Sequence, residues 1–137
     1  MGGFKRLKLL LDTHIILWSV AEPEKLLPEI VEELENESNE LWYSPISVWE
    51  IHLLAEKGHI LVGSDIEKSI RDIFQKLPFT AAPINLEVAL GSRQVNLPHQ
   101  DPADRFLAAT AVVYDLTLVT ADARIIAAEG IPVLSAG

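Results

Sequence analysis

Short apolar segments alternate along this chain with longer stretches of helical periodicity, and that alternation restricts the possible folds most. Strands are predicted over residues 7–11, 41–44, 79–82, 116–120 and 131–134. Helices are predicted over residues 13–20, 28–39, 45–57, 65–76, 85–93, 102–114 and 122–128. Strands joined through helices of this length lie parallel in one sheet. The sequence therefore predicts an α/β fold, a three-layer α/β/α arrangement with a mainly parallel central sheet.

The length of 137 residues predicts a single domain over residues 1–137, because two separate cores would each be small. The chain has no cysteine, which excludes a disulfide scaffold, a Cys-ligated metal site and a thiol nucleophile. It has no run of about 18 apolar residues that could span a membrane. Residues 1–11 hold too few apolar side chains for a signal peptide. We therefore expect a cytoplasmic protein with no membrane partner.

The formal charge of −9 argues at first against a nucleic-acid partner. However, residues 21–40 alone contain eight glutamates against the single base Lys25, so most of the excess lies in one segment. We interpret the acidic helix predicted over residues 28–39 as a solvated helix face, although it could also imitate RNA or bind a basic partner. The total charge therefore does not exclude binding of RNA elsewhere.

Four carboxylates are predicted to meet at one edge of the sheet. Asp12 follows the first strand directly, and Asp122 lies just past the strand 116–120. Asp104 falls in the first turn of a helix, and Glu50 about one turn into another. Side chains beyond the carboxyl ends of parallel strands share one edge of the sheet, where chemistry is found in such folds.

Such a group of acids favours a metal site. Uncompensated carboxylates in one cleft repel each other, and a divalent cation removes that penalty. Oxygen ligands favour Mg²⁺ or Mn²⁺ over zinc. A bound metal of this kind lowers the pKa of water and stabilises charge on a phosphoryl group. The pattern thus predicts metal-assisted hydrolysis of a phosphodiester.

Each acid also has an ordinary structural interpretation. Asp12 and Asp122 could be N-caps, and Asp104 could simply favour the positive end of its helix. Glu50 could be solvated, but it stands in an apolar run that predicts a largely buried helix, where a carboxylate needs a partner. The run consists of Ile46, Val48, Trp49, Ile51, Leu53 and Leu54.

Several neighbouring residues are candidates for supporting roles. Ser47 shares a helix face with Glu50. Arg105 and Arg124 each follow one of the acids and could contact phosphate or pair with a carboxylate. We interpret His14 and His52 as packing residues and His99 as a loop residue.

The three tryptophans are interpreted as core residues, although they could alternatively stack on bases. They are Trp18, Trp42 and Trp49.

At these residues the sequence resembles the PIN-domain ribonucleases, in particular the VapC-type toxins of toxin–antitoxin pairs. The matching stretches are LLLDTH, SPISVWEI, KGHI, HQDPADRFLAA and LVTAD, at residues 9–14, 44–51, 57–60, 99–109 and 118–122. The resemblance implies a parallel sheet with helices on both faces and an endoribonuclease that depends on Mg²⁺ or Mn²⁺. It also implies an RNA substrate, a cognate antitoxin that covers the active-site groove, and a homodimer.

Residue by residue, the resemblance assigns catalytic and metal-binding roles to the four acids, Asp12, Glu50, Asp104 and Asp122. Thr13 and Thr120 match the hydroxyls beside that site. Asp101 matches the Asp-Pro pattern of the family, and we interpret it as the cap that positions the acid three residues later.

We therefore expect a metal-dependent endoribonuclease that acts as the toxin of a toxin–antitoxin pair. The alternative is a catalytically weak PIN-like module that binds RNA or a protein partner. A phosphatase or phosphoacceptor domain is less favoured, because residues 115–124 lack the lysine that such proteins place after a late strand.

Overall fold

A computed structural model describes residues 6–137, so the first five residues of the predicted domain lie outside the description. Its five strands form one sheet in the order β3-β2-β1-β4-β5. The strands are β1 (Lys8–Leu11), β2 (Glu40–Tyr43), β3 (Phe79–Ala81), β4 (Thr117–Thr120) and β5 (Val133–Ser135). All four neighbouring pairs are parallel, which confirms the predicted parallel sheet.

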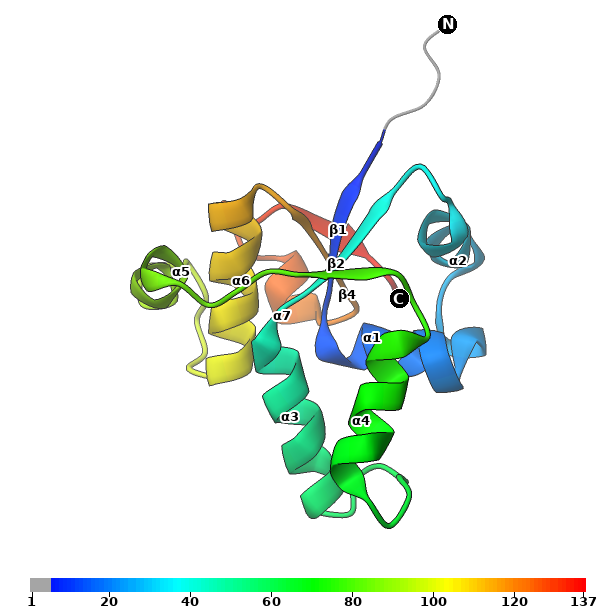
Figure 1. The fold of residues 1–137 in the computed structure, drawn as a ribbon. Coiled ribbons are helices and arrows are strands. Elements are labelled where there is room, and N and C mark those ends of the chain that lie inside the picture. The colour runs from blue at the N-terminus through cyan, green and yellow to red at the C-terminus, as the bar shows by residue number, and fades with distance from the viewer. Residues whose placement is uncertain (1–5) are drawn as a thin grey trace, which may run out of the picture.

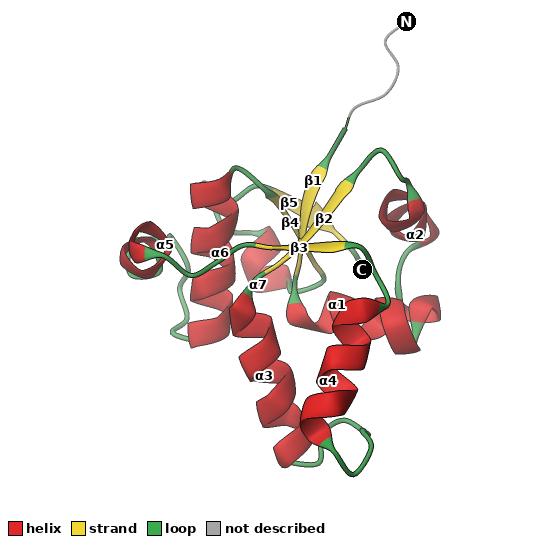
Figure 2. Ribbon diagram, viewed as in Figure 1, coloured by secondary structure: helices red, strands yellow, loops and turns green. Residues whose placement is uncertain are grey.

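Helices cover both faces of this sheet, as Figures 1 and 2 show. They are α1 (Thr13–Ala21), the short 3₁₀ helix η1 (Pro23–Lys25), α2 (Pro28–Glu35), α3 (Pro45–Glu56), α4 (Ile66–Gln75), α5 (Leu86–Gly91), α6 (Pro102–Tyr114) and α7 (Ala123–Ile126). In the view of Figure 1, α5, α6 and α7 lie to the left of the sheet, and α1 and α2 lie to the right. The three-layer α/β/α prediction is therefore confirmed.

Strand β1 explains why two cores form. Successive side chains of a strand point to opposite faces, and a strand covered on both faces is apolar throughout. Leu9 and Leu11 enter a core shared with α1, α2, α3 and α4. Leu10 enters a second core shared with α6 and α7. All three leucine side chains are fully buried, so β1 lies at the centre of both layers.

The helices around the site begin where the caps predict. The Ser44 hydroxyl accepts a hydrogen bond from the Ile46 backbone N–H at 3.1 Å, and Pro45 opens α3. Asp101 likewise caps α6 by accepting from the Asp104 backbone N–H at 3.3 Å. Each cap satisfies a backbone donor that has no partner within the helix.

Helix α2 ends at Glu35, earlier than the predicted limit at residue 39. The side chain of Asn39 is bonded elsewhere, because its Nδ2 donates to the Glu33 carbonyl and its Oδ1 accepts from the Leu7 backbone N–H. Asparagine side chains that bond to backbone compete with helix continuation in this way.

Helix α3 corrects the prediction of a largely buried helix. Only Ser47 and Ile51 are buried in it, and Trp49 is 51% exposed. In Figure 1, α3 and α4 extend away from the sheet together, so one stripe of α3 packs and the rest faces outward. The core interpretation of Trp49 is therefore wrong, whereas Trp18 and Trp42 are half-buried against the two cores.

Two histidine interpretations also change. His14 is exposed and so is not a packing residue. His52 is half-buried, and its Nδ1 lies 3.3 Å from a carboxylate oxygen of Glu56 one turn later. Within residues 6–137, the structure contains no helix with the length and apolar character needed to cross a membrane.

Candidate active site

Asp12 is held by the two central strands. It follows β1 directly, and its backbone N–H donates to the Val119 carbonyl of β4 at 3.0 Å. The Thr120 hydroxyl, at the end of β4, donates to Asp12 Oδ2 at 2.7 Å. Asp12 occupies the N-cap position of α1, as the alternative interpretation predicts, but its side chain makes no capping hydrogen bond, so capping does not account for the carboxylate. A buried carboxylate therefore lies at the carboxyl edge of the sheet with one oxygen fixed.

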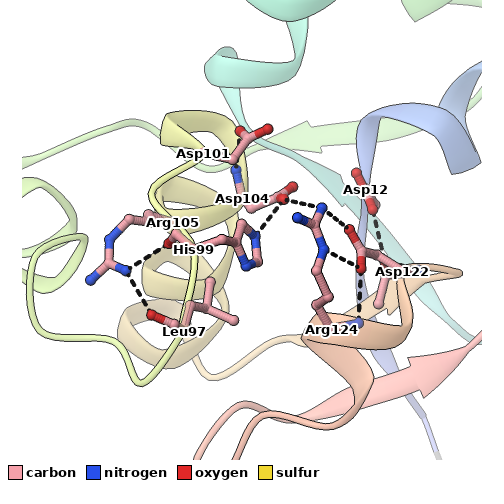
Figure 3. Close-up of polar contacts among 9 residues, drawn as sticks. Asp12, Leu97, His99, Asp101, Asp104, Arg105, Asp122 and Arg124 are labelled. Carbon is pink, nitrogen blue, oxygen red and sulfur yellow. Dashed lines mark hydrogen bonds and ion pairs between the residues drawn. The ribbon is translucent and has the colours of Figure 1, made fainter.

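A cavity of about 330 Å³ opens beside Asp12. The structure brings all four predicted acids together around it, and Asp101 joins them. Its lining residues are Asp12, His14, Trp18, Glu50, Asp101, Asp104, Ala121, Asp122 and Arg124. Figure 3 shows that the aspartates reach this space from β1, from the start of α6 and from the turn after β4.

The hydroxyls predicted beside the acids connect the elements that carry them. Thr13, the first residue of α1, donates through its hydroxyl to the Ser47 hydroxyl of α3 at 2.9 Å. Both side chains are fully buried. This bond fixes the first turn of α3 against α1, and Glu50 lies one turn further along α3.

Burial makes this cavity costly for negative charge. Burial raises the pKa of Asp12, Glu50 and Asp104 above the ordinary carboxyl value, and repulsion between neighbouring acids raises these pKa values further. Asp122 differs, because its hydrogen bonds with the Arg124 side chain lower its pKa. In three of the four acids burial thus makes the charged form less favourable, and a bound cation would offset that effect.

Arg124 pairs with carboxylates, which is one of the two roles predicted for it. Its Nη2 lies 2.9 Å from Asp122 Oδ2 and 3.8 Å from Asp104 Oδ2. Asp122 also caps α7 by accepting from the Arg124 backbone N–H at 2.9 Å. The capping interpretation of Asp122 is therefore confirmed, and the same side chain lines the cavity.

The structure gives Arg105 a different role from the predicted contact with phosphate or a carboxylate. The side chain is buried, and its guanidinium donates to the backbone carbonyls of Ser92, Leu97, His99 and Val95 at 2.8, 3.1, 3.1 and 3.2 Å. Within residues 6–137 it has no carboxylate partner, so the predicted pairing with an acid is wrong. Its donors are directed at the loop before α6, and Arg105 is not among the residues that line the cavity.

His99 is the residue of this site that sequence reasoning missed. Although it lies in the loop as predicted, its Nε2 is 2.8 Å from Asp104 Oδ2, and both side chains are largely buried. Its position five residues before Asp104, beside the Asp-Pro cap, is the signal that could have identified it.

The donors fit a hard divalent cation by chemistry. Asp12, Glu50, Asp104 and Asp122 offer only oxygen atoms to one open cavity, and these are the ligands of Mg²⁺ and Mn²⁺. With the side chains as placed, no three His, Cys, Asp or Glu residues of the described part of the chain come close enough to hold an ion. Ion binding therefore requires movement within this group of acids. Asp104 directs its Oδ2 atom at His99 and Arg124, as Figure 3 shows, so it would take part through Oδ1 while Oδ2 stays bonded to His99.

The chain is similar to known proteins over nearly its whole length. The PIN domain family model matches residues 9–131. Ribonuclease VapC22 of Mycobacterium tuberculosis is 31% identical over 120 residues, which cover 85% of this chain and 88% of that protein.

Two solved structures share the fold. VapBC2 from Rickettsia felis, bound to a DNA fragment from its promoter, matches with a TM-score of 0.71 at 16% identity, over 96% of this chain and all of that one. DNA-bound VapBC from Salmonella typhimurium matches with a TM-score of 0.71 at 20% identity, over 94% of this chain and 98% of that one. The parallel sheet, the acid-lined cavity at its carboxyl edge and the family match agree, and the chain belongs to the PIN domain family.

Proposed function

We propose that this protein is a metal-dependent endoribonuclease and the toxin of a toxin–antitoxin pair. The single observation that carries the proposal is the cavity in which Asp12, Glu50, Asp104 and Asp122 converge. The 31% identity to a protein named as a ribonuclease supports RNA as the substrate. The similarity to VapBC complexes supports an antitoxin partner.

The reaction is hydrolysis of a phosphodiester. Water adds to phosphorus, the bond from phosphorus to the leaving oxygen breaks, and a proton passes to that oxygen. Bound Mg²⁺ or Mn²⁺ would lower the pKa of water and offset the charge that develops on the phosphate oxygens. Asp12, Glu50, Asp104 and Asp122 would hold the ion.

The protein supplies orientation and proton acceptors. Thr120 fixes one oxygen of Asp12, and the Thr13–Ser47 bond fixes the helix that carries Glu50. Carboxylates whose pKa is raised are better general bases near neutral pH. Burial raises the pKa of Asp12, Glu50 and Asp104 in the metal-free protein, so an acid of this group that does not contact the ion would be suited to that role.

The decisive experiment is RNA cleavage by antitoxin-free protein with Mn²⁺, with EDTA and with Asp12→Asn. We expect cleavage that requires both the metal and the Asp12 carboxylate. The alternative, a PIN-like module that binds RNA or a protein without cutting, predicts RNA binding with no products under any condition. Cleavage that persists in EDTA or in the Asp12→Asn variant contradicts the proposal.

An apolar cavity next to the acids is the proposed site for the antitoxin. It measures about 540 Å³, lies between α1 and the segment after α3, and shares His14 and Trp18 with the acid-lined cavity. Leu61 on its rim is fully exposed. An apolar partner segment seated there would cover the entrance to the acids, and exposed apolar side chains at such a site favour protein binding. Leu61→Glu should weaken inhibition by the antitoxin while RNA cleavage continues.

The proposed homodimer has a candidate surface on the other side of the sheet. Helices α5 and α6 expose Leu86, Leu90 and Val112 by 70%, 53% and 51%. This surface lies opposite the acidic helix α2 in Figure 1, so two chains could meet there with their most negative segments apart. Leu90→Glu should shift the mass in light scattering from two chains to one, and an unchanged mass would contradict this surface.

A further inference from the structure

The Asp104 carboxylate has a hydrogen-bonding partner within the protein, the side chain of His99. His99 Nε2 lies 2.8 Å from Asp104 Oδ2, and the two side chains are only 14% and 13% exposed. Figure 3 shows the imidazole pointing from the loop toward the carboxylate. A hydrogen bond this short between largely buried groups holds the carboxylate in one rotamer and leaves the other oxygen available.

Burial of the other ring nitrogen, Nδ1, indicates that the hydrogen of the imidazole lies on Nε2. His99 Nδ1 is the one buried side-chain nitrogen or oxygen of residues 6–137 that has no hydrogen-bond partner. A hydrogen on Nδ1 would be buried without an acceptor, whereas a hydrogen on Nε2 makes the bond to Asp104. His99 therefore donates from Nε2, and its orientation depends on the loop that carries it.

The loop itself is held by Arg105. The four carbonyls that accept from the Arg105 guanidinium span residues 92–99 and include that of His99 itself. Because Arg105 directly follows Asp104 in α6, one turn of helix carries both the acid and the anchor of the loop. The guanidinium thus fixes the distance between His99 and Asp104.

We propose that His99 is a positioning residue for Asp104, held in place by the loop folded around Arg105. The inference rests on the proposed function, because its purpose is to present Asp104 to a metal ion. His99 itself touches neither the ion nor the RNA. Positioning partners of metal-binding carboxylates commonly change metal affinity by about 10- to 100-fold when they are removed.

Two substitutions separate positioning from simple packing. In His99→Gln, the side-chain amide nitrogen can still donate to Asp104 over a similar reach. In His99→Leu, the volume is kept approximately but the donor is lost. Gln100→Leu is the matched control, because Gln100 is an exposed neighbour in the same loop that does not contact Asp104.

The measurements are Mn²⁺ affinity by calorimetric titration, the melting temperature in EDTA, and KM and kcat for RNA cleavage. We expect His99→Leu to weaken Mn²⁺ binding by about 10- to 100-fold and to lower kcat more than it raises KM. His99→Gln and Gln100→Leu should remain close to the native affinity. Because calorimetry is performed on folded protein, a lower melting temperature alone does not produce this pattern.

Three results would overturn the inference. If His99→Leu binds Mn²⁺ as tightly as the native protein, or if His99→Gln is as weak as His99→Leu, the donor is unimportant and the proposed function still stands. If the native protein binds no Mn²⁺ and cuts no RNA, the inference and the proposed function fail together.

Discussion

Replacing Arg105 by methionine tests whether a buried guanidinium holds the loop before α6. Methionine fills a similar length but donates nothing, so the carbonyls of Ser92, Leu97 and His99 lose the guanidinium donor, and that of Val95 keeps only the Leu97 backbone N–H. Those of Ser92 and Leu97 form fully buried bonds with Arg105, and the other two bonds are only partly buried. The partly exposed carbonyls can turn to water, so the buried pair carries most of the cost.

The magnitude follows from those two carbonyls. Leaving a buried acceptor unsatisfied costs about 1–3 kcal/mol, so the pair together costs about 2–6 kcal/mol. The loss in the free energy of unfolding is smaller than this sum, because the substitution also removes the desolvation cost of burying the Arg105 guanidinium. We expect a net loss of about 2–4 kcal/mol in the free energy of unfolding, a large share of the roughly 5–15 kcal/mol of a typical domain.

The assay is urea unfolding in EDTA, followed by tryptophan fluorescence, with the slope on denaturant checked for constancy. Arg105→Lys keeps the charge but cannot reach four carbonyls from one ammonium group, so it should also lose stability. Arg71→Met is the control, because Arg71 is an exposed arginine that forms a surface ion pair with Glu67 and should change little. A loss below about 1 kcal/mol in Arg105→Met would refute the reasoning, since that is less than one unsatisfied carbonyl costs.

Four further predictions concern the acid-lined cavity. Asp12→Asn should stabilise the protein in EDTA at pH 7, because burial raises the pKa of Asp12 and makes its charge unfavourable there; equal or lower stability would contradict this. For the same reason the native protein in EDTA should gain stability as the pH falls through the raised pKa of Asp12 toward the ordinary value of 3.8. In that pH range the folded state binds more protons than the unfolded state. In the Asp12→Asn variant this dependence of stability on pH should be weaker. Thr120→Val removes the donor to Asp12 Oδ2 and should cost about 1.5–3 kcal/mol in urea unfolding, with a stability equal to native as the contrary result. Arg124→Gln removes a cation beside Asp104 and Asp122 and should tighten Mn²⁺ binding a few-fold by calorimetry, whereas weaker binding would show that Arg124 assists the ion.

The fold and the positions of Asp12 and Asp122 could be predicted from the strands. An apolar strand such as residues 8–11 can be recognised from the sequence alone, and in a parallel sheet the residue after it lies at the carboxyl edge. Asp12 and Asp122 therefore needed no knowledge of the remaining structure. The roles of the four acids in metal binding and catalysis stay predictions.

Arg105 and His99 could not be placed in the same way. The partners of Arg105 are backbone carbonyls, which every residue has, so no pattern of side chains reveals them. The loop before α6 has no repeating structure, and the contact of His99 with Asp104 exists only once that loop is folded. Sequence reasoning therefore assigned Arg105 to phosphate or an acid.

Trp49 and His14 were misjudged for a different reason. The apolar residues of α3 occur on all sides of the helix, so periodicity gives no preferred stripe. Which side packs is decided by α1, α4 and α6, the helices that α3 contacts. His14 faces away from the core because Thr13, Ile15 and Ile16 take the buried positions of α1.

The order of strands in the sheet also determines when the site can exist during synthesis. Thr120 of β4 bonds to Asp12 across a separation of 108 residues. A ribosome that adds about 5–20 residues per second needs roughly 5–20 s to make that intervening chain. A nascent chain that ends before β4 carries Asp12 and Glu50 but neither Thr120 nor Asp122. The acid-lined cavity therefore cannot form on a nascent chain until translation has passed Asp122, and any activity begins only after that point.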